Sequence, residues 1–176
     1  MKQAVNSLGT GHGYLTLDVT SPEAAEQAML ASIQKFGGLD ILISNAGAAH
    51  AEPMLSISED DLRGAFELNF FSHYSFSTAA AKIFRNQNRG GQILFNISKQ
   101  AVNPGKNFGA YGMPKATTFF LMKQLALELG ANGIRVNGVN ADRIRSGLLT
   151  DDFISSRAKS RGVSESDYMA GNLLNK

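Results

Sequence analysis

The chain contains no cysteine in its 176 residues. A disulfide framework is therefore excluded, as are a thiolate metal site and a cysteine nucleophile. The composition, with 43% hydrophobic and 18% charged residues, is that of a globular protein rather than a disordered one. We therefore expect one globular domain with a sizeable core.

Long apolar runs are also missing. The most apolar segments, such as residues 39–43, are far too short to cross a bilayer. The first residues, Met1 to Asn6, lack the apolar centre of a signal peptide. These absences favour a cytoplasmic protein without a membrane partner.

The chain has neither a strong charge nor a cluster of metal ligands. Its net charge is +2 and its basic residues are scattered, so nucleic acid is not expected as a partner. The histidines His12, His50 and His73 are widely separated and lack the spacing of metal ligands on a helix. A metal hydrolase is therefore disfavoured, and no metal site is predicted.

What the sequence does contain is an alternation of apolar strands and helices. Gly37, Gly38 and Gly130 stand where helices should end. The alternation predicts an α/β fold, a Rossmann-like parallel sheet with helices on both faces, in a single domain over residues 1–176. The expected strands are residues 14–19, 39–43, 91–98 and 133–140, and the expected helices are residues 22–36, 58–84 and 110–130, with polar helices after them.

The strongest chemical signal lies between Ser98 and Lys115. Ser98 ends a predicted strand, Tyr111 follows thirteen residues later near the start of an apolar helix, and Lys115 comes four residues after it. A spacing of four on a helix places Tyr111 and Lys115 on one face. A phenol beside a cation suits proton transfer near neutral pH. Pro114 is expected in the first turn of this helix.

Two further features lie near the ends of the expected strands. Asn45-Ala46-Gly47 follows the strand at residues 39–43, where small residues allow a ligand to approach the backbone, although a plain tight turn would look the same. Asn69 interrupts an apolar helix as either a buried polar contact or a functional kink. By contrast, Gly9, Gly11 and Gly13 precede a strand and lack the spacing of a phosphate-binding loop.

In order and spacing, these features resemble the short-chain dehydrogenase/reductase family, which has a Rossmann-type fold and uses NAD or NADP. The resemblance implies that Tyr111 is the general acid/base and that Lys115 lowers its pKa and holds the nicotinamide ribose. It implies that Ser98 binds the substrate oxygen and that Asn69 positions a water. Cofactor contacts are implied for Asp18, Val19, Asn45, Ala46, Gly47, Tyr111 and Lys115.

The segment from Asn96 to Leu174, especially residues 98–105 and 139–148, is similar to the dehydrogenase part of bifunctional rhamnulose-1-phosphate aldolase/alcohol dehydrogenases. That resemblance implies rhamnose metabolism and a small aldehyde substrate such as lactaldehyde. The implied activity is an NAD(P)-dependent interconversion of an alcohol and a carbonyl. The implied partners are the small-molecule substrate and either further copies of the chain or a larger fused chain.

The sequence also departs from the family. Lys99 replaces a second serine found in many members, and Asn140-Ala141 replaces Pro-Gly. The family's first two strands with their glycine loop, and its last strand, have no counterpart. We therefore expect a domain truncated at both ends that binds NAD(P) poorly by itself, and the choice between NAD and NADP stays open. The alternative is a noncatalytic fragment or association subunit.

The apolar side chains of Phe70, Phe71, Phe119 and Phe120 are expected in the core.

Overall fold

The computed structural model describes residues 5, 7–142, 144 and 149–171, and its centre is a three-stranded parallel sheet. The strands β1 (Ile41–Ser44), β2 (Gly91–Asn96) and β3 (Ile134–Val139) lie in the order β1-β2-β3. Ile43 pairs with Leu94, which pairs with Asn137. All three strands therefore end at the same edge of the sheet, where ligands bind in open α/β sheets. The predicted α/β, Rossmann-like fold class is confirmed.

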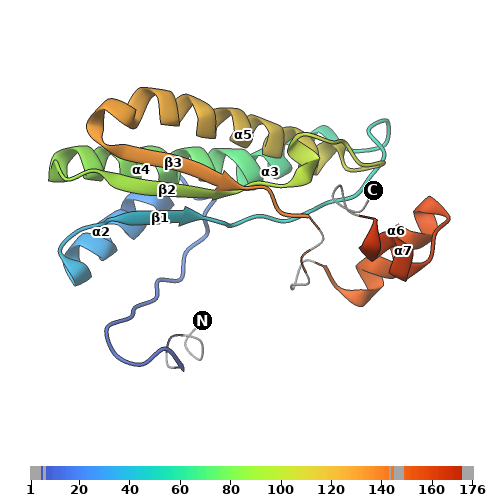
Figure 1. Ribbon diagram of the computed structural model, residues 1–176, viewed down its shortest axis with the longest axis horizontal. Helices are drawn as coiled ribbons and strands as arrows, with labels where there is room; N and C mark the ends of the chain where they lie inside the picture. The colour runs from blue at the N-terminus through green and yellow to red at the C-terminus, as the bar shows by residue number, and fades with distance from the viewer. Residues whose placement is uncertain (1–4, 6, 143, 145–148, 172–176) are drawn as a thin grey trace.

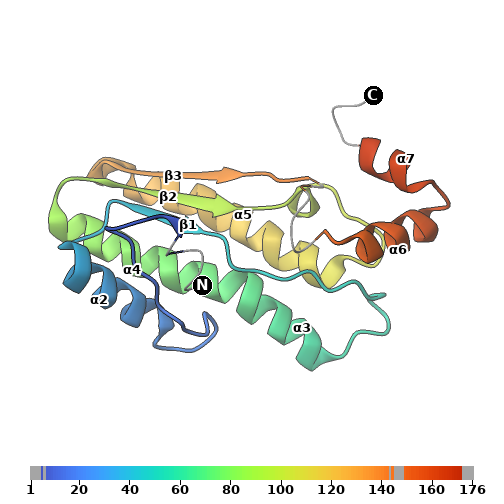
Figure 2. The same ribbon diagram turned by 90° about the horizontal axis from the view of Figure 1, so that it is seen from below.

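The long helices cover one face of the sheet. Figure 2 shows α2 (Ala24–Phe36), α4 (Ser72–Gln87) and α5 (Gly109–Leu129) on the same side of the strands. Alternate strand residues point toward these helices, because side chains in a strand alternate between its two faces. The core cluster contains the buried residues Met29, Ala80, Ala81, Phe84, Ile93, Phe95, Ile97, Leu125, Leu129, Ile134 and Val136.

The second face of the sheet is open in the described part of the chain. Ile43 is 65% exposed and Ile41 is also exposed, although both are strongly apolar. Arg135 and Asn137 of β3 pair in register with this row and are exposed too. The helices expected on this face are thus not among the described elements, and an apolar surface is left facing solvent.

The N-terminal segment differs from the prediction. Residues 12–18 form no strand, and most of their side chains are exposed. The apolar pattern of residues 14–19 suggested a strand, but a strand needs a neighbour to satisfy its backbone hydrogen-bonding groups. In the described chain no strand lies beside this segment, so the prediction of a strand at residues 14–19 was wrong.

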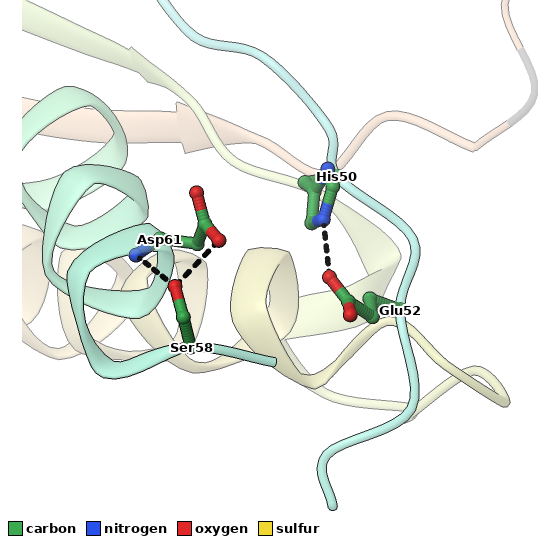
Figure 3. A network of polar contacts seen from close by, with 4 residues as sticks. All are labelled: His50, Glu52, Ser58 and Asp61. Carbon is green, nitrogen blue, oxygen red and sulfur yellow. Dashed lines mark hydrogen bonds and ion pairs between the residues drawn. The ribbon is translucent and has the colours of Figure 1, made fainter. Parts of the chain in front are cut away.

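The helix predicted over residues 58–84 forms in three continuous parts. It comprises α3 (Glu59–Phe66), the π-helical turn η1 (Glu67–Phe71) and α4. Ser58 caps its start, since the Ser58 hydroxyl accepts a hydrogen bond from the Asp61 backbone amide at 3.0 Å (Figure 3). A π-turn carries one extra residue per turn and is frequent at functional sites. Asn69 lies within it.

The remaining helices follow the prediction with one correction. Helix α5 begins at Gly109, so Pro114 is inside the helix rather than in its first turn. Proline there removes one backbone hydrogen bond within the helix. After β3, α6 (Asp151–Arg161) and α7 (Glu165–Ala170) are capped by Thr150 and Ser164 and lie beyond the strand ends (Figure 1). They share a small apolar cluster of Ile154, Ala158 and Tyr168.

The expectation of core burial for the phenylalanines holds only in part. Phe119 packs against the core cluster, whereas Phe71 and Phe120 are exposed. Among the helices described, none combines the length and apolarity needed to span a bilayer.

The strand predicted at residues 39–43 is observed as β1, starting two residues later. Leu39 pairs instead with the side chain of Gln87 at the end of α4. The Leu39 amide donates to the Gln87 Oε1 at 2.9 Å, and the Gln87 Nε2 donates to the Leu39 carbonyl at 2.6 Å. A side-chain amide thus occupies both backbone groups of Leu39.

Candidate active site

A cavity of about 380 Å³ opens at the carboxyl ends of the strands. It is bounded on one side by the strand ends and the start of α5, and on the other by α6 and α7. Its lining residues are Asn45, Gly47, Ala49, Asn96, Ile97, Ser98, Lys99, Gln100, Phe108, Tyr111, Val139, Ala141, Asp142, Ile144, Leu149, Phe153, Arg157, Arg161 and Tyr168.

Ser98 and Tyr111 meet at this cavity. Ser98 lies just beyond β2 and caps the short 3-10 helix η2 (Lys99–Ala101), accepting a hydrogen bond from the Gln100 amide at 3.2 Å. Tyr111 lies in the first turn of α5, and its ring packs edge-on against Phe108 at 6.0 Å between centroids. Ser98 and Tyr111, which the sequence spacing predicted to lie close together, therefore do line the same cavity.

Lys115 lies beneath this pair, 2% exposed. Its Nζ donates to the Asn96 carbonyl at 2.9 Å and lies 5.7 Å from the centre of the Tyr111 ring. Burial lowers the pKa of Lys115 to about 8. At pH 7 the side chain is therefore still mostly an ammonium ion, a cation held beside the phenol.

The pKa of Tyr111 is shifted in the direction opposite to the one expected. Burial raises it, and the neighbouring Ser98 hydroxyl only partly opposes that increase. The cause is that a phenolate in a poorly solvated position is less stable than a neutral phenol. At neutral pH Tyr111 is thus a neutral phenol that keeps its proton.

Asn69 is 1% exposed and fully hydrogen-bonded. Its Oδ1 accepts from the Ala48 amide at 3.2 Å, and its Nδ2 donates to the carbonyls of Ala48 and Ala65 at 3.0 and 3.1 Å. Its own carbonyl accepts from the Thr118 hydroxyl at 2.9 Å. Asn69 therefore connects the π-turn η1 to the segment after β1 and to α5 by hydrogen bonds. It makes buried polar contacts and also lies within the π-helical turn.

The small residues after β1 lie close to Asn69 and Lys115. A Cβ atom on Gly47 would stand 2.8 Å from the Asn69 Oδ1 and 3.5 Å from the Lys115 Nζ. Asn45 lies in the cavity wall, where its Oδ1 accepts from the Asn96 Nδ2 at 2.7 Å. Ala46 lies between them and does not line the cavity.

Asp18 and Val19 lie away from the cavity. Asp18 is exposed, and its carboxylate accepts hydrogen bonds from the Thr20 amide and hydroxyl at 2.9 and 2.7 Å. These bonds lower the pKa of Asp18. The structure thus does not join these two residues to the rest of the predicted site.

Several polar residues near the site were missed by the sequence reasoning. The His73 Nδ1 lies 2.6 Å from the Ser44 hydroxyl. Burial, and secondarily the charge of Lys115, lowers the pKa of His73 to about 4, while the backbone of Ala46 acts in the opposite direction. Lys99 pairs with Asp142 at 2.7 Å, and Arg157 and Arg161 line the far wall. In the sequence, only the four-residue spacing of Arg157 and Arg161 after the helix-capping Thr150 indicated that these two arginines share a helix face.

The histidines do not gather. His50 pairs with Glu52 at 2.9 Å on the surface (Figure 3), whereas His73 is buried. Among the described residues, no group of three or more histidine, aspartate or glutamate side chains could hold a metal ion. The residues after Asp142 in the segment 139–148 lie outside the described set, apart from Ile144.

Comparison with known proteins identifies the family. Residues 1–174 match the family model described as enoyl-(acyl carrier protein) reductase. The uncharacterized oxidoreductase YuxG of Bacillus subtilis is 34% identical over 84% of the chain, and an L-rhamnose 1-dehydrogenase (NAD(P)(+)) of a Sphingomonas species is 31% identical over 77% of it. A solved 7α-hydroxysteroid dehydrogenase, complexed with NADH and 7-oxo glycochenodeoxycholic acid, is 30% identical over 88% of the chain, with a TM-score of 0.79.

The chain spans only part of each of these proteins: 22% of YuxG, 54% of the rhamnose dehydrogenase and 61% of the solved hydroxysteroid dehydrogenase. The family model nevertheless covers the sheet, the long helices and the cavity, because it matches residues 1–174. With a family model matched along residues 1–174 and relatives at or above 30% identity, the chain belongs to the short-chain dehydrogenase/reductase family.

Proposed function

We propose that the chain is the catalytic part of an NAD(P)-dependent oxidoreductase that interconverts an alcohol and a carbonyl compound. The observation that carries the proposal is the position of Tyr111 and Ser98 in the cavity wall, with the Lys115 ammonium beneath them. Membership of the family and the NAD(P) named for the rhamnose dehydrogenase support it.

The residues present fit one end of a nicotinamide cofactor. Gly47 lines the cavity wall beside Lys115 and carries no side chain, so a ligand in the cavity can approach its backbone closely. Asn45, Ala46, Gly47, Tyr111 and Lys115 would hold the nicotinamide and its ribose. Among the described residues no glycine loop precedes a helix to bind the pyrophosphate. Asp18 and Val19 are kept as the proposed adenine-side contacts.

Each side chain then has a role in carbonyl reduction. The hydroxyls of Ser98 and Tyr111 would donate hydrogen bonds to the carbonyl oxygen. A reduced nicotinamide, when bound, would supply the hydride, and Tyr111 would give its proton to the carbonyl oxygen as the alcohol forms. The Lys115 ammonium stabilises the resulting phenolate. In the reverse direction, the phenolate takes the proton from the alcohol.

Asn69 is proposed to position a water molecule that links Lys115 to solvent. Asn69 also has a structural role, because its hydrogen bonds to Ala48 and Thr118 hold the segment after β1 against α5.

Replacing Tyr111 by phenylalanine tests the proposal directly. In the intact protein, Tyr111→Phe should lower carbonyl turnover by about 10²-fold or more, because the proton donor is lost, while NADH binding stays nearly unchanged. Turnover is followed by NADH absorbance over a panel of aldehydes and ketones, and binding by fluorescence titration. Tyr74→Phe, on the exposed side of α4, is the control and should keep full turnover. Unchanged turnover in Tyr111→Phe would exclude the assignment.

For the substrate, we propose a small aldehyde such as lactaldehyde, within rhamnose breakdown. The similarity to an L-rhamnose 1-dehydrogenase supports a link to that sugar. The match to 22% of YuxG supports a chain that works as part of a longer, fused protein. Sequencing the gene upstream of Met1 tests this directly, and an aldolase domain there would support the fused form.

A noncatalytic association subunit is the second candidate. The observation that favours it is the open apolar face of the sheet, where Ile41 and Ile43 are exposed. Exposed Phe71 and Phe120 on the helical side offer a second surface for pairing between copies. The complete set of Asn69, Ser98, Tyr111 and Lys115 argues for the enzyme.

A further inference from the structure

Two arginines of α6 face the same cavity as the reacting hydroxyls. Arg157 and Arg161 lie one helical turn apart and both line the cavity wall. Arg157 is only 5% exposed, which is unusual for a charged side chain without a carboxylate partner. The sequence reasoning saw only a polar helix in this region and gave neither residue a role.

The position of Arg157 is fixed by aromatic packing and by hydrogen bonds to the Lys106 carbonyl and the Tyr168 side chain. Its guanidinium carbon lies 4.3 Å above the centre of the Phe108 ring, and its Nη1 donates to the Lys106 carbonyl at 3.0 Å. Phe108 in turn lies 6.0 Å from the Tyr111 ring. These two ring distances place the Arg157 guanidinium within about 10 Å of the centre of the Tyr111 ring.

That arrangement leaves hydrogen-bonding capacity unused. A guanidinium has five N–H donors. The buried Nε of Arg157 has no hydrogen-bond partner in the described chain. Arg161 is held from the other side, with its guanidinium carbon 5.2 Å from the centre of the Tyr168 ring. Both side chains thus pack against aromatic rings, and no ion pair joins either of them to a carboxylate in the described part of the chain.

The charges at this wall are not balanced. No ion pair joins Arg157 or Arg161 to a carboxylate among the described residues, and the residues outside that set contain no aspartate or glutamate. Burial lowers the pKa of Arg157, the charge of Arg161 lowers it further, and Tyr168 raises it. Lys99 provides the contrast, because this cavity-lining cation is neutralised by Asp142 at 2.7 Å.

We propose that the substrate carries a phosphate or carboxylate group, which Arg157 and Arg161 bind while its carbonyl lies at Ser98 and Tyr111. The inference rests on the proposed function, carbonyl reduction at Ser98 and Tyr111, and it selects an anionic carbonyl compound in place of the neutral lactaldehyde. Two adjacent guanidiniums present the donors that planar carboxylates and phosphates accept. A neutral aldehyde such as lactaldehyde would leave both charges unpaired in the cavity. The anionic group therefore supplies orientation as well as affinity.

Anion binding can be measured without turnover. The chain is titrated with sodium phosphate or sodium acetate at constant ionic strength, using sodium chloride as the reference, and binding is followed by thermal unfolding. Phosphate, acetate or both should raise the midpoint in the unmodified chain. A higher unfolding midpoint with phosphate indicates a substrate that is a phosphate ester, and a higher midpoint with acetate indicates a substrate with a carboxylate.

Variants on the same helix make the test specific. Arg161→Gln should weaken the anion effect at least about tenfold, because it removes one charged donor without opening the core. Arg157→Gln should do the same, and it is the less decisive variant because Arg157 is buried. Lys159→Gln, an exposed cation of α6 outside the cavity, should behave like the unmodified chain.

Two results would overturn the inference: no effect of either anion beyond chloride, or an equal effect in the Arg161→Gln and unmodified chains. Neither result touches the role of Tyr111, which is judged by turnover. Conversely, full turnover in Tyr111→Phe would remove the catalytic assignment while leaving a measured anion site in place. In the intact protein, dihydroxyacetone phosphate and dihydroxyacetone form a matched pair, and Arg161→Gln should raise KM for the phosphate ester only.

Discussion

Gly47 has room for a hydrogen atom and for little more. An added methyl group would press on the Asn69 Oδ1, which is buried and already bonded to the Ala48 amide. Gly47→Ala should therefore lower the free energy of unfolding by about 1–3 kcal/mol, the usual range for an overpacked site. It should also reduce cofactor binding in the intact protein.

Gly64 in α3 provides the matched control for this substitution. A Cβ there meets nothing within 4 Å, so Gly64→Ala should raise the free energy of unfolding by about 0.5–1 kcal/mol through helix propensity. Urea denaturation measures both variants. Equal effects at the two positions would show that the close approach of Gly47 is unimportant.

His73 should make the fold sensitive to mild acid. Burial holds its pKa near 4 in the folded chain, below the ordinary 6.5, so the unfolded chain takes up the proton first as the pH falls. Above pH 6.5 the contribution of His73 to the free energy of unfolding does not change with pH. Between pH 6.5 and about pH 4 the free energy of unfolding falls as the pH falls, by at most about 1.4 kcal/mol per pH unit. Urea denaturation from pH 7 to pH 4 should show a shallower loss in His73→Gln. His50→Gln, at an exposed histidine, should match the unmodified chain, and parallel curves for all three would refute the prediction.

At the residue scale, sequence reasoning succeeded where spacing alone decides proximity. Tyr111 and Lys115 share a helix face, and Ser98 ends the neighbouring strand, so all three could be brought together from their positions in the chain. The direction of the Tyr111 pKa could not be predicted in this way, because it depends on burial by groups distant in sequence. The same holds for Arg157, whose position depends on Phe108 from another segment.

At the element scale, the long helix was predicted but its π-turn was not. A π-turn leaves no marker in apolar periodicity beyond a one-residue offset. Its stability here comes from tertiary hydrogen bonds, such as the one from the Thr118 hydroxyl to the Asn69 carbonyl. The predicted strand at residues 14–19 does not form because a strand also depends on tertiary contacts. Its apolar pattern was suitable, but no neighbouring strand is present in the described chain.

The open face of the sheet should govern self-association of this chain. Ile43→Lys places a charge at a 65% exposed apolar position and should lower association, seen as a smaller average mass by light scattering at equal concentration. Leu55→Lys, in the exposed loop before α3, is the control and should leave the mass unchanged. An identical mass for Ile43→Lys and the unmodified chain would rule out association through this face.

At the scale of the whole molecule, only the nicotinamide side of the proposed cofactor site is present among the described residues. The residues proposed for proton transfer lie together, whereas no described residues form a pyrophosphate-binding loop. Calorimetric titration of the 176-residue chain should therefore show NADH binding weaker than about 1 mM, equivalent to less than about 4 kcal/mol. Binding in the micromolar range would show that this chain holds the whole cofactor by other means.

The side-chain amide of Gln87 bears on strand pairing between copies at the free edge of β1. An incoming strand at the free edge of β1 would need open backbone donors and acceptors, and those of Leu39 are already engaged by Gln87. The edge available for pairing is thus confined to the four residues of β1, which is short for a continuous intermolecular ladder. We therefore expect Gln87 to limit where an incoming strand can pair with β1 and to oppose the growth of an intermolecular sheet from this edge.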